Sequence, residues 1–243
     1  MTNSRAGKWT RVFVDGYDLT IRGTDVIPPH SVHDEVPVDG YTQDHCYLNG
    51  MADAITSFTG FFDQSTGKTH DALNVIASGD TQKLITVALG DNALPAIGDT
   101  TFSMPAVQSS YVVNPNLKAA IVASGTFKSL GTPAEVGVLL ADLTGISGDG
   151  DTASVNNGAS SADGGVGYLH LYGISAGDTV VIKIQDSAND AVWADLITFT
   201  LDGSAIGAER IEVTGTVDQY LQVTYDVTGT GVDFDFAVAF HRN

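Results

Sequence analysis

The chain has 243 residues and carries 11 Lys and Arg against 29 Asp and Glu, which gives a formal net charge of -18 at pH 7. An apolar share of 43% is enough for a folded core, and the length suits one large all-β unit or two small domains. The scarcity of basic residues excludes a nucleic-acid-binding surface, because phosphate groups are bound by clustered Lys and Arg.

The chain begins with the polar segment MTNSRAGKWT, which lacks the apolar core of a signal peptide. No stretch approaches the roughly 18 apolar residues that a membrane span needs. We therefore expect a protein that stays in the cytosol of the producing cell or leaves it by lysis. The single cysteine, Cys46, excludes an internal disulfide.

Strand-forming residues dominate, and Asp-Gly or Asn-Gly pairs separate many of the runs. The first hairpin is predicted from Val12 to Val14 and from Tyr17 to Ile21. Asp15-Gly16 lies between these runs, and such a pair suits a type I′ turn because both turn residues need positive φ.

A polar stretch rich in histidine follows, and it is interpreted as a long solvated loop with Pro28 and Pro29 near its start. A transition-metal site is the alternative, although the spacing matches no metal motif. Its candidate ligands are His30, His33, Asp34, Glu35, Asp44, His45 and Cys46.

One short helix is predicted, with Thr69 as its N-terminal cap and Gly79 at its C-terminal end. Ala72, Leu73 and Ile76 share one face of this helix.

The segment from Ser147 to Gly167 reads SGDGDTASVNNGASSADGGVG and has almost no large apolar side chains. It predicts a flexible linker at 147–166, between a domain at 1–146 and a second domain at 167–243. Asp149, Asp151, Asn156 and Asn157 offer oxygen ligands for calcium, but the EF-hand spacing is absent and the linker interpretation is favoured.

Six regularly spaced strand runs follow the predicted linker and indicate a compact β-sandwich. They are Gly167 to Ile174, Asp178 to Gln185, Val192 to Leu201, Ala208 to Gly215, Gln219 to Val227 and Val232 to His241. The aromatic residues of this part are assigned to the core, with an exposed sugar-binding platform as the alternative. These residues are Trp193, Phe199, Tyr220, Tyr225, Phe234, Phe236 and Phe240.

No motif for a nucleotide cofactor is found. The chain has no Walker loop and no Gly-x-Gly-x-x-Gly after a strand. Cys46 next to His45 is interpreted as a structural thiol rather than a nucleophile. We therefore predict a non-enzyme, and no catalytic, cofactor-binding or metal-binding residue is assigned.

Several segments, taken in order, resemble the major tail proteins, or tail tube proteins, of long-tailed bacteriophages, and especially those of actinobacteriophages. They are the hairpin TRVFVDGYDLT, the strand TSFTGFFD and the segment GKTHDALNVIASGD, followed by VVIKIQDSANDAVWADLITFTL, AERIEVTGTVDQYLQVTYDV and FAVAFHRN. The resemblance covers nearly the whole chain except the predicted linker.

The resemblance implies an all-β fold: a tail-tube β-sandwich or half-barrel with one short helix, followed by a second small β-sandwich. It also implies rings of identical subunits that stack into a tube for DNA passage, with the segment from about Arg22 to Asn49 as an arm to the adjacent ring. Rings of six subunits, or of three with pseudo-sixfold symmetry, both remain open. The implied partners are further copies of the chain, a tape measure protein, and the tail terminator and distal tail proteins.

The net charge indicates an acidic lumen to which DNA does not adhere. Two other functions fit the same composition: a capsid decoration or other virion surface protein, and a carbohydrate-binding module.

Overall fold

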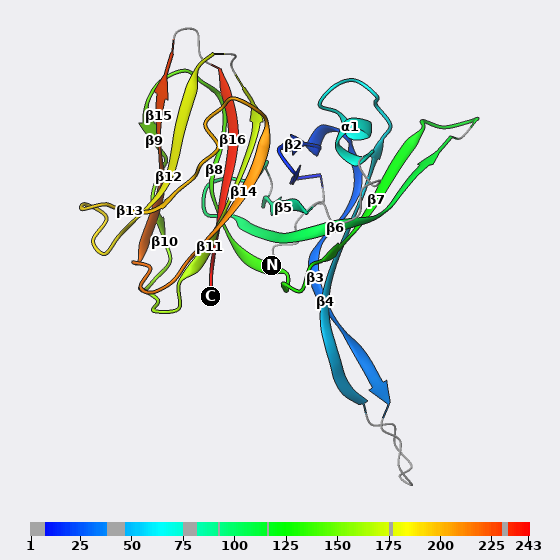
Figure 1. The fold of residues 1–243 in the computed structure, drawn as a ribbon, viewed down its shortest axis with the longest axis horizontal. Coiled ribbons are helices and arrows are strands. Elements are labelled where there is room, and N and C mark those ends of the chain that lie inside the picture. The colour runs from blue at the N-terminus through cyan, green and yellow to red at the C-terminus, as the bar shows by residue number, and fades with distance from the viewer. Residues whose placement is uncertain are drawn as a thin grey trace.

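A computed structural model describes residues 8–37, 47–74, 82–91, 93–115, 117–174, 177–229 and 233–243. Nearly all of the regular structure is antiparallel β-sheet, as predicted (Figure 1). The elements of the first half are β1 (Thr10–Val14), β2 (Tyr17–Asp18), the 3-10 helix η1 (Thr20–Arg22), β3 (Gly23–Pro37), β4 (Tyr47–Phe61), α1 (Thr69–Leu73), β5 (Lys83–Leu89), β6 (Thr100–Asn114) and β7 (Val122–Ser129). The second half contains β8 (Glu135–Ile146), β9 (Gly150–Asp151), β10 (Val155–Asn156), β11 (Gly165–Gly173), β12 (Thr179–Ser187), β13 (Ala194–Thr198), β14 (Gly207–Val213), β15 (Tyr220–Thr228) and β16 (Phe234–Arg242).

The predicted N-terminal hairpin is confirmed at its turn, but its second strand is only Tyr17–Asp18, and Thr20–Arg22 form η1 where the strand was predicted to continue to Ile21. Val14 pairs with Tyr17, and the two turn residues both have positive φ, 52° at Asp15 and 80° at Gly16. A Cβ atom at Gly16 would lie only 2.4 Å from the backbone nitrogen of Gly207. Glycine is therefore needed here both for the turn and for the close approach of the segment that begins β14.

The long strand β6 divides the larger sheet into two branches, a first that forms a half-barrel and a second that forms one layer of a β-sandwich. Its first residues pair with β8 on one side and with β5 on the other. Ala106 pairs with Lys83 of β5 and with Ser129 of β7, so β7 lies on the side opposite β5. From there the sheet continues through β7 to β4 and then to β3.

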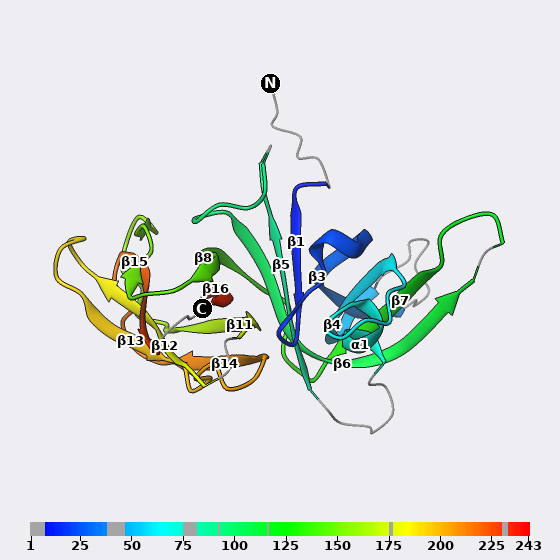
Figure 2. The same ribbon diagram turned by 90° about the horizontal axis from the view of Figure 1, so that it is seen from above.

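The first branch, made of β1, β5, β6, β7, β4 and β3, curls into a half-barrel around its own core, as seen from above in Figure 2. That core includes Val87 of β5, Met104 of β6, Phe58 of β4, Phe127 of β7 and Leu73 of α1. The helix runs only from Thr69 to Leu73 and its N-cap is Lys68, so the prediction of Thr69 as the cap was wrong. Thr69 is buried inside the first turn instead, and the predicted helical residues Ile76 and Gly79 lie outside the described residues.

The second branch forms one layer of a β-sandwich, and the smaller sheet forms the other. The first layer is β14-β11-β16-β8 and the second is β10-β15-β12-β13, with β9 added to β15. All six predicted strand runs are confirmed. The predicted core role is also confirmed for the four phenylalanines Phe199, Phe234, Phe236 and Phe240, which are buried between the layers.

Within the segment predicted as a flexible linker, the chain forms two short strands that pair with β15. Asp151 of β9 pairs with Thr224, and Val155 of β10 pairs with Leu221. Between them the buried Thr152 hydroxyl oxygen accepts a 2.9 Å hydrogen bond from the backbone of Val223. Backbone pairing needs no large side chains, so these two strands could not be predicted from the composition of the segment. The sandwich also takes in β8 from residues 1–146, and the division into domains at 147–166 stays a prediction.

Candidate functional site

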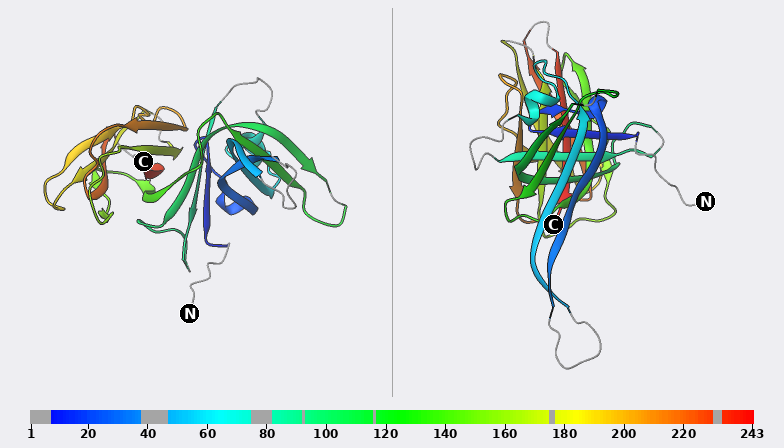
Figure 3. Two further views of the ribbon diagram at one scale, coloured as in Figure 1. Left: turned by 90° about the horizontal axis from the view of Figure 1, so that it is seen from below. Right: turned by 90° about the vertical axis from the view of Figure 1, so that its right-hand side faces the viewer.

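The hairpin β3–β4 extends past the rest of the sheet as a two-stranded projection (Figures 1 and 3). Strand β7 pairs with β4 only from Ile55 to Phe61, so residues 47–54 pair with β3 alone. We call residues 31–37 and 47–54 the arm. A strand of 15 residues is about 50 Å long, so the arm reaches well beyond the core of its own subunit.

The arm corrects the interpretation of the histidine-rich stretch as a loop. His30, His33, Asp34 and Glu35 lie on β3, whose ladder with β4 continues after a register shift between Ile27 and His30. Pro28 and Pro29 occupy that irregularity, where an edge strand tolerates the missing N–H groups. The other predicted ligands Asp44, His45 and Cys46 lie outside the described residues, and within the described residues no group of three His, Cys, Asp or Glu is placed to hold a metal ion.

The arm belongs to a segment with charge of one sign only. Residues 23–67 contain seven acidic side chains and no Lys or Arg. Arg22 and Lys68 flank this segment in the sequence. Asp34 is exposed on the arm, so the projection is acidic.

The four-stranded sheet β6–β7–β4–β3 ends in two edges that no described strand covers. Strand β3 pairs only with β4. Beyond Ala106, β6 pairs with β7 on one side, and on the side of β5 no strand in the described ranges continues the ladder. Unpaired N–H and C=O groups at such edges are templates for pairing with another chain.

One face of this sheet is covered by the half-barrel core, and the other, which we call the open face, is not. Side chains of the core face, such as Phe58 and Phe127, are buried near α1. The open face presents half-exposed hydroxyl side chains from three strands, namely Ser57, Thr59, Ser110, Ser124 and Thr126. Strand alternation also puts the exposed Asp25 and Lys128 on this face.

The turn end of the β6–β7 hairpin is apolar and exposed. Val112 is 57% exposed, Val113 38%, Leu117 105% and Ile121 41%. Apolar side chains gathered at one projecting point indicate a contact surface rather than ordinary surface scatter.

A buried polar cluster joins the half-barrel to the sandwich. Arg11 of β1 donates a 2.6 Å hydrogen bond to Asp142 of β8, and the hydroxyl of Tyr172 on β11 donates one of 2.9 Å to the same carboxylate oxygen. Burial and the Asp142 charge raise the pKa of Tyr172 above its usual value. The Phe13 ring stacks on Tyr172 with centroids 5.4 Å apart, so the two parts are held by packing as well as charge.

Next to this cluster, His170 is fully buried and stacks on Phe13 with ring centroids 5.6 Å apart. Its Nε2 lies 2.9 Å from the hydroxyl of Thr86 on β5, while its Nδ1 has no hydrogen-bond partner among the described residues. Burial lowers the pKa of His170 to about 3, so the ring is neutral at physiological pH.

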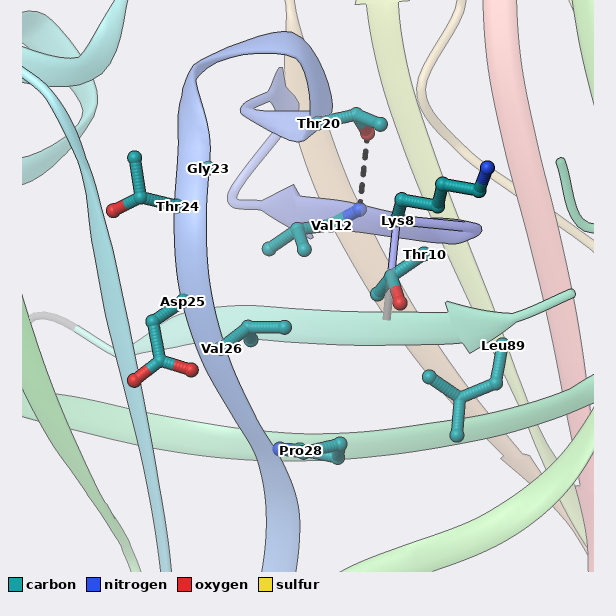
Figure 4. A pocket seen from close by; sticks show the side chains of 10 residues that line it. All are labelled: Lys8, Thr10, Val12, Thr20, Gly23, Thr24, Asp25, Val26, Pro28 and Leu89. Atoms are coloured by element: carbon teal, nitrogen blue, oxygen red, sulfur yellow. Dashed lines mark hydrogen bonds between the residues drawn. The ribbon is translucent and has the colours of Figure 1, made fainter. Parts of the chain in front are cut away.

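The half-barrel is open between β1 and β3, where a pocket of about 490 Å³ separates the two strands (Figure 4). Thr10 and Val12 line it from β1, and Val26 and Pro28 line it from β3. The backbone N–H of Val12 donates to the Thr20 hydroxyl at 3.0 Å, so η1 takes up part of the β1 edge. The lining of this pocket mixes Thr, apolar and charged side chains.

The remaining candidate residues have structural roles. Asp149 accepts a 2.7 Å hydrogen bond from the backbone of Val227, and Asn156 accepts bonds from Gly158 and Gln219. Asp151 lies in β9, and Asn157 donates to backbone carbonyls. The other three aromatic residues are only partly buried, and they are Trp193, Tyr220 and Tyr225.

Within the described residues, no helix is long and apolar enough to cross a membrane.

No protein-family model matches the chain. No curated protein matches it either. Among solved structures, the chain is similar to one from the virion of a native gene transfer agent particle, with a TM-score of 0.40 and 18% identity over 53% of this chain and 96% of that one. It is also similar to the SPP1 Dit (gp 19.1) protein, of the hub adsorption apparatus in Gram-positive infecting phages, with a TM-score of 0.35 and 12% identity over 96% and 99% of the two chains. A third match, the structure of infectious bursal disease virus Gx strain, has a TM-score of 0.28 and 10% identity over 98% and 69%. All three TM-scores lie below 0.5, so these matches establish neither a shared fold nor a function.

Proposed function

We propose that this chain is a structural virion protein that forms head-to-tail rings, and that the rings stack into the tail tube of a long-tailed bacteriophage. The observation that carries the proposal is the four-stranded sheet β6–β7–β4–β3 with an uncovered edge on each side. The sequence resemblance to tail tube proteins supports the same function independently of the sheet topology.

The strand directions are compatible with a closed ring. Each neighbouring pair in the four-stranded sheet is antiparallel, so β3 runs opposite to β6. If β3 of one copy lies beside β6 of the next, that new pair is also antiparallel, and the alternation continues around the ring. A head-to-tail interface between two different edges closes into a ring when the rotation between copies permits it.

If each copy contributes only these four strands, the size of the barrel favours six copies, because a ring of three with pseudo-sixfold symmetry would need a second set of wall strands from each copy. With strands about 4.8 Å apart and tilted by about 40°, 24 strands give a backbone diameter of about 48 Å, and 12 strands about 24 Å. Inward side chains take about 5 Å from each wall, half the usual spacing between packed sheets. The smaller barrel then leaves a channel about 14 Å wide. This is narrower than the roughly 16 Å obtained by adding the depths of the major and minor grooves of B-form DNA, so the duplex would not fit.

The open face is the side that we propose lines the channel, because the subunit's own core occupies the opposite face. In this arrangement β3, β4, β6 and β7 form the wall, and the sandwich, which includes β8, β9 and β10 as well as residues 167–243, lies outside it. Among the described residues of β3, β4, β6 and β7, Lys128 is the only Lys or Arg. Because the whole chain also carries a net charge of -18, we propose an acidic lumen that repels DNA phosphates. Replacing Asp25 by Lys should slow DNA ejection at low salt, and an unchanged rate would contradict the lumen assignment.

The proposed partners are other copies of the chain, a tape measure protein inside the tube, and the tail terminator and distal tail proteins at its ends. The arm is proposed to contact the adjacent ring. Negative-stain microscopy of the purified full-length protein at high concentration tests the proposal. Tubes or stacked rings support it, whereas trimers that bind capsid shells would indicate a decoration protein instead.

A further inference from the structure

A second pocket of about 390 Å³ lies between the half-barrel and the sandwich, and we call it the junction pocket. It is lined by the β1–β2 turn, by the residues just before α1 and by parts of β8 and β11. The elements β2 and α1 beside it lie at the end of the molecule away from the arm (Figures 1 and 3). The subunit therefore has a projection at one end and a pocket at the other.

Basic residues outnumber acidic ones in the lining of the junction pocket, whereas the opposite holds for the whole chain. Acidic residues outnumber basic ones by 29 to 11 overall. The pocket is lined by Arg11, Arg22 and Lys68 but by only two carboxylates, Asp18 and Asp235. Like-charged copies repel one another, so a contact between them is favoured where one side carries cations.

Two of the three cations already have partners within the subunit. Arg11 pairs with Asp142 at 2.6 Å, and Arg22 with Asp63 at 3.0 Å. Lys68 is exposed, its side chain makes no capping hydrogen bond to α1, and its charge attracts the Asp63 carboxylate that already pairs with Arg22. Lys68 is thus the cation of this pocket that is best placed to receive an acidic group from outside.

We infer that the arm of one copy docks in the junction pocket of a copy in the next ring, with Asp34 near Lys68. This inference rests on the proposed function, because stacking brings opposite ends of successive subunits together. The occupant is argued from charge: the segment that contains the arm has seven acidic residues and no basic ones, and the pocket is where basic residues gather.

The test is a charge reversal at Lys68. Lys68→Glu should leave folded subunits and intact rings but shorten the tubes at least about tenfold, because like charges facing each other oppose docking. Lys183→Glu is the matched control, since Lys183 lies on β12 of the sandwich and pairs with Asp195 away from the pocket. This control should form tubes of normal length.

Asp34→Lys provides a rescue. Alone it should also shorten the tubes, and combined with Lys68→Glu it should restore most of their length. Tubes of wild-type length formed by the Lys68→Glu variant would overturn the docking site while leaving the tube function intact. So would a double variant whose tubes stay as short as those of the single variants. A wild-type protein that forms neither rings nor tubes would instead overturn the proposed function itself.

Discussion

Arg11 on β1 and Asp142 on β8 form a 2.6 Å ion pair that connects the half-barrel to the sandwich, 131 positions apart in the sequence. Their side chains are only 12% and 13% exposed. Removing one member of such a pair leaves the other charge buried without compensation, which costs more than the pair itself contributes. This contact therefore holds the two parts of the subunit in one arrangement.

Arg11→Leu should lower the free energy of unfolding by about 3 kcal/mol, because Asp142 is left buried without its cation. Urea denaturation measures the change. Arg11→Leu combined with Asp142→Leu should recover part of the loss, since the buried Asp142 charge is then gone, while Asp18, which pairs with Arg11 at 3.5 Å, still lacks its cation. The surface pair Lys183–Asp195 is the control, and Lys183→Ala should lower the free energy of unfolding much less. An equal effect of the two single variants would contradict the structural role of the Arg11 pair.

His170 should make the fold sensitive to mild acid. Its pKa in the folded protein is lowered to about 3 by burial, whereas an unfolded histidine titrates near 6.5. The unfolded chain therefore binds a proton first as the pH falls, so this residue lowers stability progressively between about pH 6.5 and pH 3. Between pH 7 and pH 5 the loss is about 2 kcal/mol.

His170→Leu should remove that part of the pH dependence. The measurement is urea denaturation of the wild type and the variant at pH 7 and at pH 5, with the difference between the two pH values compared rather than absolute stability. If both proteins lose the same free energy, His170 is not the neutral buried group described above.

Shortening the arm should separate ring formation from stacking. Val32 pairs with Asp53, so replacing residues 33–52 by Asn-Gly joins the paired strands through a two-residue turn. We expect a folded protein, checked by circular dichroism, that forms rings but not tubes in electron micrographs. Tubes of normal length from this variant would show that the arm has no role in stacking.

Proline at neighbouring positions tests the free edge of β6. Val112 and Val113 are adjacent, so their N–H groups point to opposite sides of the strand, one toward β7 and one toward the uncovered edge. One of Val112→Pro and Val113→Pro should therefore lower thermal stability, and the other should leave it nearly unchanged. The stable variant should fail to form rings in analytical ultracentrifugation, and normal rings from it would contradict edge pairing through β6.

The parts of the fold that were predicted correctly from the sequence depend on local chemistry. Asp15-Gly16 specifies its turn because few residues accept positive φ, and alternating residues define the six strands of the second half. The arm was mistaken for a loop because His30, His33 and the two prolines are not strand formers. Its strand conformation depends on pairing with β4, which lies across the hairpin.

The assembly surfaces were not predictable from composition for a related reason. An edge is free only when every other strand has been placed, and Ala106, where the two branches meet, carries no mark of that role in the sequence. Likewise, Arg11, Arg22 and Lys68 are dispersed along the chain and come together only in the folded subunit. The sequence resemblance supplied the expectation of rings, but not the edges that would form them.

The most direct test of the central claim is cryo-electron microscopy of the purified full-length protein at high concentration. We predict tubes whose wall is a continuous barrel of 24 strands, estimated at four per copy for six copies, with β3 of each subunit antiparallel to β6 of its neighbour. Subunits that remain separate at every concentration, or an assembly in which both edges face solvent, would contradict it.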